Sequence, residues 1–296
     1  MSDGPLIILG CGYVGTAVAR AARAAGRTVR ACARGSGRLQ PLLAEGIEVK
    51  YLDAAIPKQI TAAVASLHGG TVLYSIPPAS SGPPGQAVRN SLQAAYGVGA
   101  ECFIYLSSSG QYGAYPDDDT WIDEDSPLAH DDPPMLGVQK EEDLVREHQF
   151  DRLRTVILRL APVYGPRRGV RERLRKGDYK LLDEGQHSIS RVHIDDVIKV
   201  IFACEDRAPD RSTFLVADDE PTTQRDYAAW LSARMGLPMP PTRSMYEPGG
   251  ARVLHRNRKI RNTRLKETLG LALSYPTFRE GEAAIEAAIG EAPARE

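Results

Sequence analysis

A hexapeptide with three glycines, GCGYVG at residues 10–15, constrains the fold more than any other stretch of this chain. It follows the apolar run PLIIL (5–9), whose pattern is that of a buried strand. It also opens the alanine-rich segment 13–26, whose composition favours a helix. A glycine-rich turn between a strand and a helix predicts the beginning of a strand–helix–strand unit, whereas the same spacing alone would predict only a tight turn.

The three glycines have separate physical roles in such a turn. Gly10 permits the sharp bend, Gly12 lets a pyrophosphate approach the backbone, and Gly15 lets the helix pack closely against the strand. The first helical residues, Tyr13 and Val14, add backbone N–H groups that attract an anion. We therefore predict a dinucleotide site at this turn.

Strand-like and helix-like segments alternate through the first half of the chain. Further strands are expected at residues 28–33, 47–53, 71–76, 102–108 and 154–161, with helices at 39–46, 58–70, 85–99 and 135–148. This alternation predicts an α/β fold, a doubly wound parallel Rossmann sheet with helices on both faces. After Pro162 the pattern changes to longer loops, basic clusters and isolated helices near 194–205 and 224–235. We therefore expect a Rossmann domain over 1–165 and a smaller substrate-binding lobe over 166–296, with the helix at 194–205 packing back on the first domain.

The end of the second strand indicates which dinucleotide would bind. It reads CARGSGR, with Arg34, Ser36 and Arg38 and no acidic residue. An acid at this place would hold the ribose hydroxyls of NAD, whereas arginine suits the 2′-phosphate of NADP. NADP is thus the preferred cofactor and NAD the second choice, unless the arginines are merely solvated surface charges. Asp53, which ends the third strand, is expected either to accept a hydrogen bond from the adenine or to cap a turn.

Composition excludes several other classes of protein. The net charge of −1 over 296 residues indicates neither a nucleic-acid nor a membrane partner. Four scattered cysteines favour a reducing compartment and no structural zinc, and no apolar run is long enough to span a bilayer. The N-terminus lacks the basic region of a signal peptide, so we expect a cytoplasmic protein. The residues of HIDD, 193–196, are metal-ligand types but are expected to cap a helix, and no metal is predicted.

Several longer motifs resemble those of the extended short-chain dehydrogenase/reductase superfamily, the NAD(P)-dependent epimerase/dehydratase family, in an atypical branch. They are YLSSSGQYG (105–113), WIDEDSPL (121–128), LRLAPVYGPRRG (158–169), RVHIDDVIKVI (191–201) and IRNTRLKETLG (260–270). The resemblance implies an oxidoreductase in which a tyrosine, a lysine and a serine assist hydride transfer to or from a nicotinamide. It also implies a small-molecule substrate and the possibility of a homodimer through the helices at 85–99 and 135–147.

The family's active-site pattern is incomplete in this chain. Its YxxxK motif falls on LGVQK, so Leu136 stands where the tyrosine belongs and Lys140 where the lysine belongs. By the same resemblance Ser108 polarises the substrate, Lys140 anchors the ribose, and Tyr112 is the nearest replacement acid. The alternatives are a serine that satisfies its own strand end, an exposed surface lysine and a structural tyrosine.

Three further residues are expected to contact the substrate: Ser109, Tyr164 and Arg191, and the alternative role of Tyr164 is packing. The basic stretch 167–180 is either a clamp for an anionic substrate or a solvated helix whose arginines pair with Glu172, and Arg191 is a further candidate for such a clamp. The sequence therefore predicts an NAD(P)-dependent oxidoreductase, reductase or epimerase-like, acting on a small anionic molecule. The alternative is a catalytically silent NADP-binding redox sensor.

Overall fold

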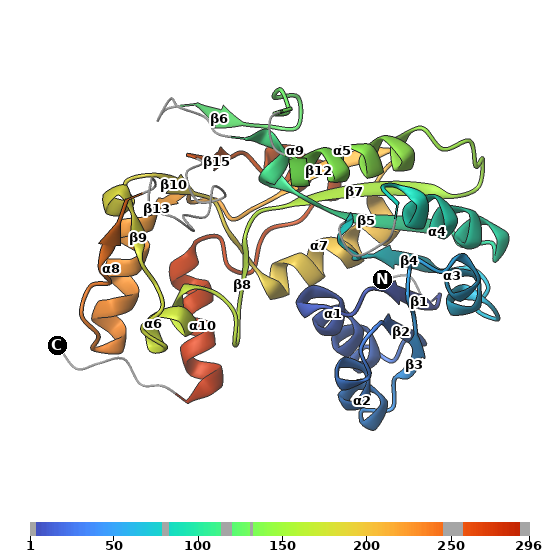
Figure 1. Cartoon of the computed structure of the whole chain (residues 1–296), viewed down its shortest axis with the longest axis horizontal. Helices are drawn as coiled ribbons and strands as arrows, with labels where there is room; N and C mark the ends of the chain where they lie inside the picture. The colour runs from blue at the N-terminus through green and yellow to red at the C-terminus, as the bar shows by residue number, and fades with distance from the viewer. Residues whose placement is uncertain (1–3, 79–82, 114–119, 131–132, 245–256, 291–296) are drawn as a thin grey trace.

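A seven-stranded parallel sheet forms the centre of the molecule (Figure 1). The computed structural model describes residues 4–78, 83–113, 120–130, 133–244 and 257–290. The strands of the sheet are β1 (Leu6–Leu9), β2 (Val29–Ala33), β3 (Glu48–Tyr51), β4 (Thr71–Tyr74), β5 (Cys102–Ser108), β7 (Arg154–Leu160) and β12 (Ser212–Val216). The predicted doubly wound parallel sheet is confirmed.

The order of the strands creates a crevice beside β1. The sheet runs β12-β7-β5-β4-β1-β2-β3, so the chain builds outward from β1 first in one direction and then in the other. At such a switch point the loops that follow two neighbouring strands diverge to opposite faces and leave a cleft at the carboxyl ends of the strands. The fold thus places a ligand site between the loops after β1 and β4.

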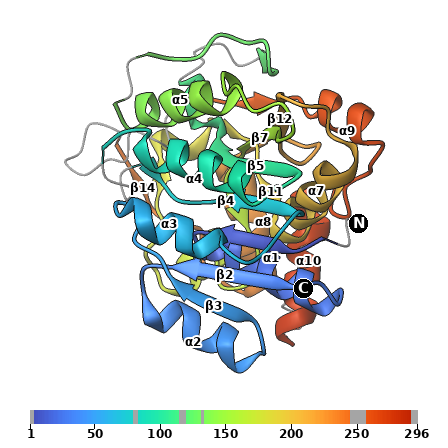
Figure 2. The ribbon, with the colours of Figure 1, turned by 90° about the vertical axis from the view of Figure 1, so that its right-hand side faces the viewer.

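Helices cover both faces of the sheet, because successive side chains of β1 point to opposite sides. Ile8 packs on one face with the helices α1, α2 and α7, whereas Ile7 packs on the other with α3, α4 and α5. Figure 2 shows α3, α4 and α5 stacked along their face of the sheet. The bounds are α1 (Tyr13–Ala24), α2 (Ser36–Ala44), α3 (Pro57–Val64), α4 (Gln86–Gly97), α5 (Pro133–Arg146) and α7 (Ile194–Arg207).

A smaller lobe lies beside the carboxyl ends of the strands and has a core of its own. The rings of Tyr227 and Phe278 meet edge to face there, with centroids 4.8 Å apart. Its helices are α6 (Val170–Arg175), α8 (Gln224–Met235) and α10 (Phe278–Ile289), while α9 (Thr263–Leu269) packs against β12. Short strand pairs complete the chain: β8 (Val163–Tyr164) with β11 (Val192–His193), β9 (Leu181–Leu182) with β14 (Thr242–Arg243), β10 (Ser188–Ile189) with β13 (Thr222–Thr223), and β6 (Trp121–Ile122) with β15 (Lys259–Ile260).

The chain leaves the sheet near residue 165, where the sequence placed the domain boundary, but it returns. Helix α7 packs against α1, and β12 then joins the edge of the sheet beside β7. The boundary at 165 therefore separates the first six strands of the sheet from the seventh. Within the part of the chain that the structure describes, no helix is long and apolar enough to cross a membrane.

Candidate cofactor and active site

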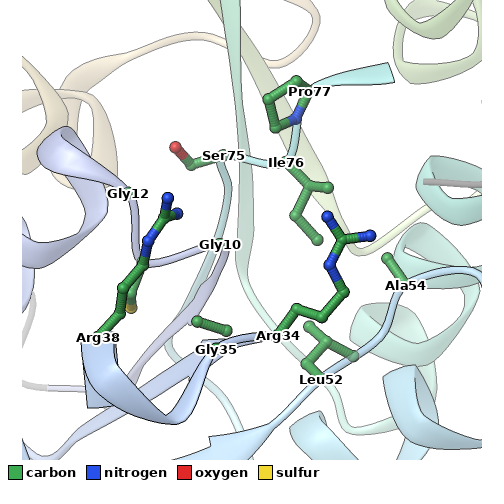
Figure 3. A pocket seen from close by; sticks show the side chains of 12 residues that line it. Gly10, Gly12, Arg34, Gly35, Arg38, Leu52, Ala54, Ser75, Ile76 and Pro77 are labelled. Atoms are coloured by element: carbon green, nitrogen blue, oxygen red, sulfur yellow. The ribbon is translucent and has the colours of Figure 1, made fainter. Parts of the chain in front are cut away.

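A cavity of about 470 Å³ opens at the carboxyl ends of β1 to β4 (Figure 3). All four loops at this edge of the sheet contribute to it, as expected at the switch point. The lining residues are Gly10, Cys11, Gly12, Ala33, Arg34, Gly35, Arg38, Leu52, Ala54, Ser75, Ile76 and Pro77.

The glycines of the first loop form a cradle that fits a pyrophosphate. Gly10 has a φ of +107°, and a β-carbon there would lie 2.6 Å from the carbonyl oxygen of Ser75. A β-carbon on Gly15 would lie 2.3 Å from the Gly10 oxygen, so the helix can approach the strand only without one. Gly12 is different, because a β-carbon there would meet nothing within 4 Å. The backbone at Gly12 thus faces open space at the start of α1, where helical N–H groups lack intrahelical partners.

Two arginines face the same cavity. Arg34 follows β2, and Arg38 lies in the first turns of α2, with its side chain exposed. Figure 3 shows both guanidinium groups directed into the cavity. The twelve described residues that line it include these arginines and no acidic side chain.

The other predicted cofactor residues occupy different places. Ser36 begins α2 and is exposed, while Val14 packs against the core beneath α1. Asp53 lies between the lining residues Leu52 and Ala54, but its carboxylate accepts the backbone N–H of Ala55 at 3.1 Å. This contact is a turn cap, one of the two roles that the sequence predicted for Asp53; the other was a hydrogen bond to the adenine.

Tyr13 joins the glycine loop to the beginning of the lobe. Its hydroxyl donates a hydrogen bond to the carbonyl oxygen of Pro166 at 3.1 Å, and the Arg168 guanidinium lies 5.0 Å from the centre of its ring. Burial raises the pKa of Tyr13 to about 12. The side chain therefore stays neutral and connects the cofactor cavity with the segment that follows β8.

Ser108 ends β5, and a methionine lies beside it. The Ser108 Oγ accepts the backbone N–H of Gly110 at 3.0 Å, which leaves its O–H free to donate. The Sδ of Met135 and the Oγ of Ser108 lie 2.7 Å and 2.9 Å from the position a β-carbon on Gly110 would occupy, so the two side chains are neighbours. Ser109 is buried, and its carbonyl oxygen accepts a bond from Arg258 at 2.7 Å.

The structure does not bring Lys140 to Ser108. Met135 and Lys140 both belong to α5, and helical geometry separates their side chains by about 140° around its axis. The Lys140 Cε instead lies near Gly85, at the start of α4. Leu136 is 43% exposed to solvent. The helical face beside the serine thus carries a thioether, which has no proton to give.

Tyr112 is buried in a polar network behind Ser108. Its hydroxyl oxygen accepts a bond from Arg159 at 2.5 Å, and burial raises its pKa to about 12. Arg159 also binds Glu142 of α5 at 2.7 Å, and Glu142 accepts further bonds from Ser107 and Gln111. This placement favours the structural role of Tyr112 over that of a replacement acid.

Tyr164 and Arg191 both lie inside the lobe. The hydroxyl of Tyr164 packs against Gly281, and its ring meets His193 edge to face at 5.2 Å. The Arg191 guanidinium is buried 3.8 Å above the centre of the Tyr227 ring. Both side chains contribute to packing where the lobe meets the sheet.

The HIDD stretch caps helices and turns. His193 Nδ1 accepts the backbone N–H of Asp195 at 3.2 Å, at the beginning of α7. The Asp196 carboxylate accepts the backbone N–H groups of Ser274 and Tyr275 at 2.6 Å and 2.9 Å. Among the residues that the structure places, no group of three or more metal-ligating side chains gathers.

Sequence reasoning missed two parts of the site. The cavity wall formed by Ser75, Ile76 and Pro77 follows β4 directly, and the rule that ligands bind beyond the carboxyl ends of strands could have found it. Met135 could not have been found in this way, because only the rotation of α5 in the structure shows which of its residues faces Ser108.

Fold and cavity together define a dinucleotide-binding α/β protein with an appended lobe. Residues 6–217 match the profile of the NAD dependent epimerase/dehydratase family. The chain therefore belongs to the NAD-dependent epimerase/dehydratase family, whose fold type is the extended short-chain dehydrogenase/reductase.

Solved structures agree along nearly the whole chain. A functionally unknown conserved protein from Silicibacter pomeroyi is 29% identical, with a TM-score of 0.82 and coverage of 96% of this chain and 99% of that one. UDP-glucose 4-epimerase from Thermotoga maritima, solved with UDP-glucose, is 18% identical with a TM-score of 0.83, over 97% and 98% of the two chains.

A dTDP-glucose 4,6-dehydratase double mutant from Streptomyces venezuelae, solved with NAD, is also 18% identical. Its TM-score is 0.79, and 97% of each chain is covered. Among curated proteins no match is found. Family membership supports a nicotinamide cofactor and an enzyme of the epimerase/dehydratase type.

Proposed function

We propose that this chain is an NADP(H)-dependent oxidoreductase that acts on a small anionic molecule. The observation that carries the cofactor choice is the cavity at β1 to β4, whose wall after β2 presents Arg34 and Arg38. A phosphate on the adenosine ribose would gain charge-assisted bonds from them, whereas NAD would have no carboxylate there to bind its ribose hydroxyls. The cradle at Gly12 would hold the pyrophosphate.

The cofactor, when bound, supplies or accepts the hydride. Ser108 would hydrogen-bond to the reacting group of the substrate, since its O–H is free to donate. Met135 beside it would add apolar surface and provides no acid. The site therefore suits a reduction that needs little proton donation, such as that of an iminium, or of a conjugated alkene with water as the proton source.

Exposed arginines at the entrance to the lobe support the anionic substrate class. Arg168 lies against Tyr13, next to the cofactor cradle, and Arg173 and Arg175 follow in α6 with half-exposed side chains. Guanidinium groups bind carboxylates and phosphates with well-defined geometry. Arg168 would bind an anionic group of the substrate next to the cofactor cradle, and Arg173 and Arg175 would add positive charge on the lobe.

Cofactor titration tests the proposal. NADPH should bind more tightly than NADH in a fluorescence titration, and Arg34→Ala should remove most of the preference, about tenfold or more, because it deletes a charge-assisted contact. Arg20→Ala is the matched control, since Arg20 is exposed on α1 and pairs with Glu45 outside the cavity. Equal affinities of the parent protein for both cofactors would refute the NADP assignment.

The silent redox sensor is the second candidate, and a specific observation favours it: the residue of α5 beside Ser108 is Met135, whereas the Lys140 side chain points to Gly85. NADPH oxidation in the presence of imines, enones and simple ketones separates the candidates. The enzyme should turn over one of the first two classes and lose about 10²-fold with Ser108→Ala, the usual size of a positioned catalytic group. Lys140→Met tests the role that the family resemblance implies for this lysine. If Lys140 anchors the ribose, the rate of NADPH oxidation should fall by a similar factor, whereas its observed position near Gly85 predicts little change in the rate. Tight NADPH binding without turnover of any of these compounds would identify the protein as a sensor.

A further inference from the structure

A second large cavity lies at the free edge of the sheet, away from the cofactor cavity. Its volume is about 560 Å³, and it opens between β12, the C-terminal part of α5, α9 and the loop after β6. The lining residues are Glu124, Asp125, Ser126, Leu128, Arg146, Arg159, Pro209, Arg211, Ser212, Thr213, Phe214, Arg264 and Thr268. The two cavities share no residue, because one lies beyond β1 to β4 and the other beside β12.

Arginine is the commonest charged residue in the lining of this edge cavity. Of the described residues that line it, four are arginines and two are carboxylic acids. Three more carboxylates outside the lining, those of Glu142, Asp143 and Asp210, pair with these arginines. Within the lining, Glu124 is buried, and its Oε1 accepts the backbone N–H of Leu215 at 2.8 Å. Burial raises the pKa of Glu124, so its carboxyl opposes the arginines less than an exposed carboxylate would.

Three of the arginines form the rim and are available to a ligand. The side chains of Arg146, Arg211 and Arg264 are 39%, 49% and 43% exposed. Arg146 binds the buried Glu142 at 3.2 Å, whereas Arg211 and Arg264 pair with carboxylates that are more distant or exposed. Arg211 lies 3.6 Å from Asp210, and the Asp125 that binds Arg264 is 76% exposed.

Surface ion pairs of this kind contribute about 0–1 kcal/mol, so a ligand with two or more charges can replace them. Two contacts keep rim arginines in place. Arg146 binds Asp143 at 3.0 Å, and Arg211 donates to the carbonyl oxygen of His148 at 3.0 Å. The rim is thus a partly preorganised set of donors.

The fourth arginine forms the floor and connects the cavity with the interior. Arg159 is 5% exposed and is held by Glu142 and by the hydroxyl of Tyr112. Glu142 neutralises Arg159, and the Tyr112 hydroxyl occupies another of its donors. A ligand would therefore make its charged contacts with the rim arginines, and Arg159 would form the bottom of the cavity.

We propose that the edge cavity is a binding site for a small phosphate-bearing molecule, held by Arg146, Arg211 and Arg264. Arginines bind phosphate oxygens with paired, charge-assisted hydrogen bonds. A cavity of about 560 Å³ lies within the usual size of small-molecule sites, so it accommodates a molecule larger than a single phosphate ion. This site is separate from the cofactor cavity and does not depend on the proposed function.

Calorimetric titration of the full chain with inorganic pyrophosphate tests the proposal. Arg264→Gln should weaken binding about tenfold, because it removes a charged donor from the rim. Asp125→Asn should strengthen binding several-fold, since it removes the carboxylate that competes for Arg264. Opposite effects from two neighbouring substitutions distinguish a site from a general change in charge or folding.

Two controls assign the binding to this cavity. Arg20→Gln removes the same charge from an exposed ion pair elsewhere and should leave the affinity unchanged. Saturating NADPH, which would fill the cofactor cavity and its pyrophosphate cradle, should leave this binding in place. Absence of binding at millimolar pyrophosphate, equal weakening by Arg20→Gln, or loss of all pyrophosphate binding in saturating NADPH would each overturn the proposal.

Discussion

The three glycines of residues 10–15 are required for different reasons. At Gly10 the positive φ and the nearby Ser75 oxygen exclude a side chain, and at Gly15 the Gly10 oxygen does the same. At Gly12 there is space, and we expect the ligand rather than the protein to use it. Folding and binding can therefore be separated by substitution within a single loop.

Gly12→Val should abolish binding of NADPH and NADH while leaving the melting temperature nearly unchanged. Gly15→Ala should instead destabilise the fold by about 1–3 kcal/mol, because even one methyl group overpacks the strand–helix contact. Calorimetry measures the binding, and circular dichroism measures the melting. Retention of cofactor affinity by Gly12→Val would mean that the loop is only a turn.

Helix α5 is the element that most determines the chemistry of the site. Glu141 and Glu142 are buried against the sheet, where Glu141 accepts a bond from Tyr105 and Glu142 binds Arg159. These contacts set the rotation of the helix, which brings Met135 toward Ser108 and turns Lys140 toward α4. Two consecutive buried carboxylates thus decide which residues of α5 can reach a substrate.

Glu142→Gln should cost about 3–5 kcal/mol of stability near pH 7, because it leaves the buried Arg159 without its charged partner. Burial raises the pKa of Glu142, but bonds from Arg159, Ser107 and Gln111 outweigh this and place the pKa below its ordinary value. A lowered folded-state pKa means that the stabilisation is complete above the unfolded-state pKa, about 4.3, and is lost as the pH falls through the folded-state value.

The difference between the parent protein and Glu142→Gln should therefore shrink in acid, and urea unfolding at pH 7 and below pH 4 measures it. Glu45→Gln is the control, since Glu45 and Arg20 form an exposed pair whose loss should change little. A constant difference across this pH range would contradict the assigned role of Glu142.

At the scale of the whole molecule, the lobe and the sheet are joined by several independent contacts. The chain returns through α7 and β12 after leaving the sheet. A buried ion pair of 2.7 Å joins Arg27, before β2, to Glu205 of α7, which fixes the returning helix on the sheet. The Tyr13 hydroxyl donates to the carbonyl oxygen of Pro166, where the lobe begins. We therefore expect sheet and lobe to unfold together.

Differential scanning calorimetry should show one transition for the full chain. NADPH at about 100 times its dissociation constant should stabilise the folded state by about 2.7 kcal/mol and raise the melting temperature by a few degrees. Gly12→Val should melt in one transition that NADPH does not shift. Two transitions, of which NADPH moves only one, would show that the lobe folds independently.

The sequence by itself determined the doubly wound sheet and the glycine cradle, because both depend on local patterns. Apolar runs alternate with helical segments, and the spacing of Gly10, Gly12 and Gly15 is a property of six consecutive residues. The position of the two arginines after β2 could also be predicted from local sequence, because residues that directly follow a strand reach the crevice at its carboxyl end. The sequence did not predict strand β12, because it is a run of only five residues that comes after the regular alternation of strands and helices has ended at Pro162.

The tertiary structure alone decided what surrounds Ser108. Family spacing paired Leu136 with the missing tyrosine, but α5 turns Met135 toward the serine and directs Lys140 to Gly85. The structure also shows that Tyr112, Tyr164 and Arg191 are buried, although the sequence predicted catalytic or substrate-binding roles for them. The physical reason is that a side chain's surroundings depend on helix rotation and on contacts between residues far apart in the chain, and no local pattern records them.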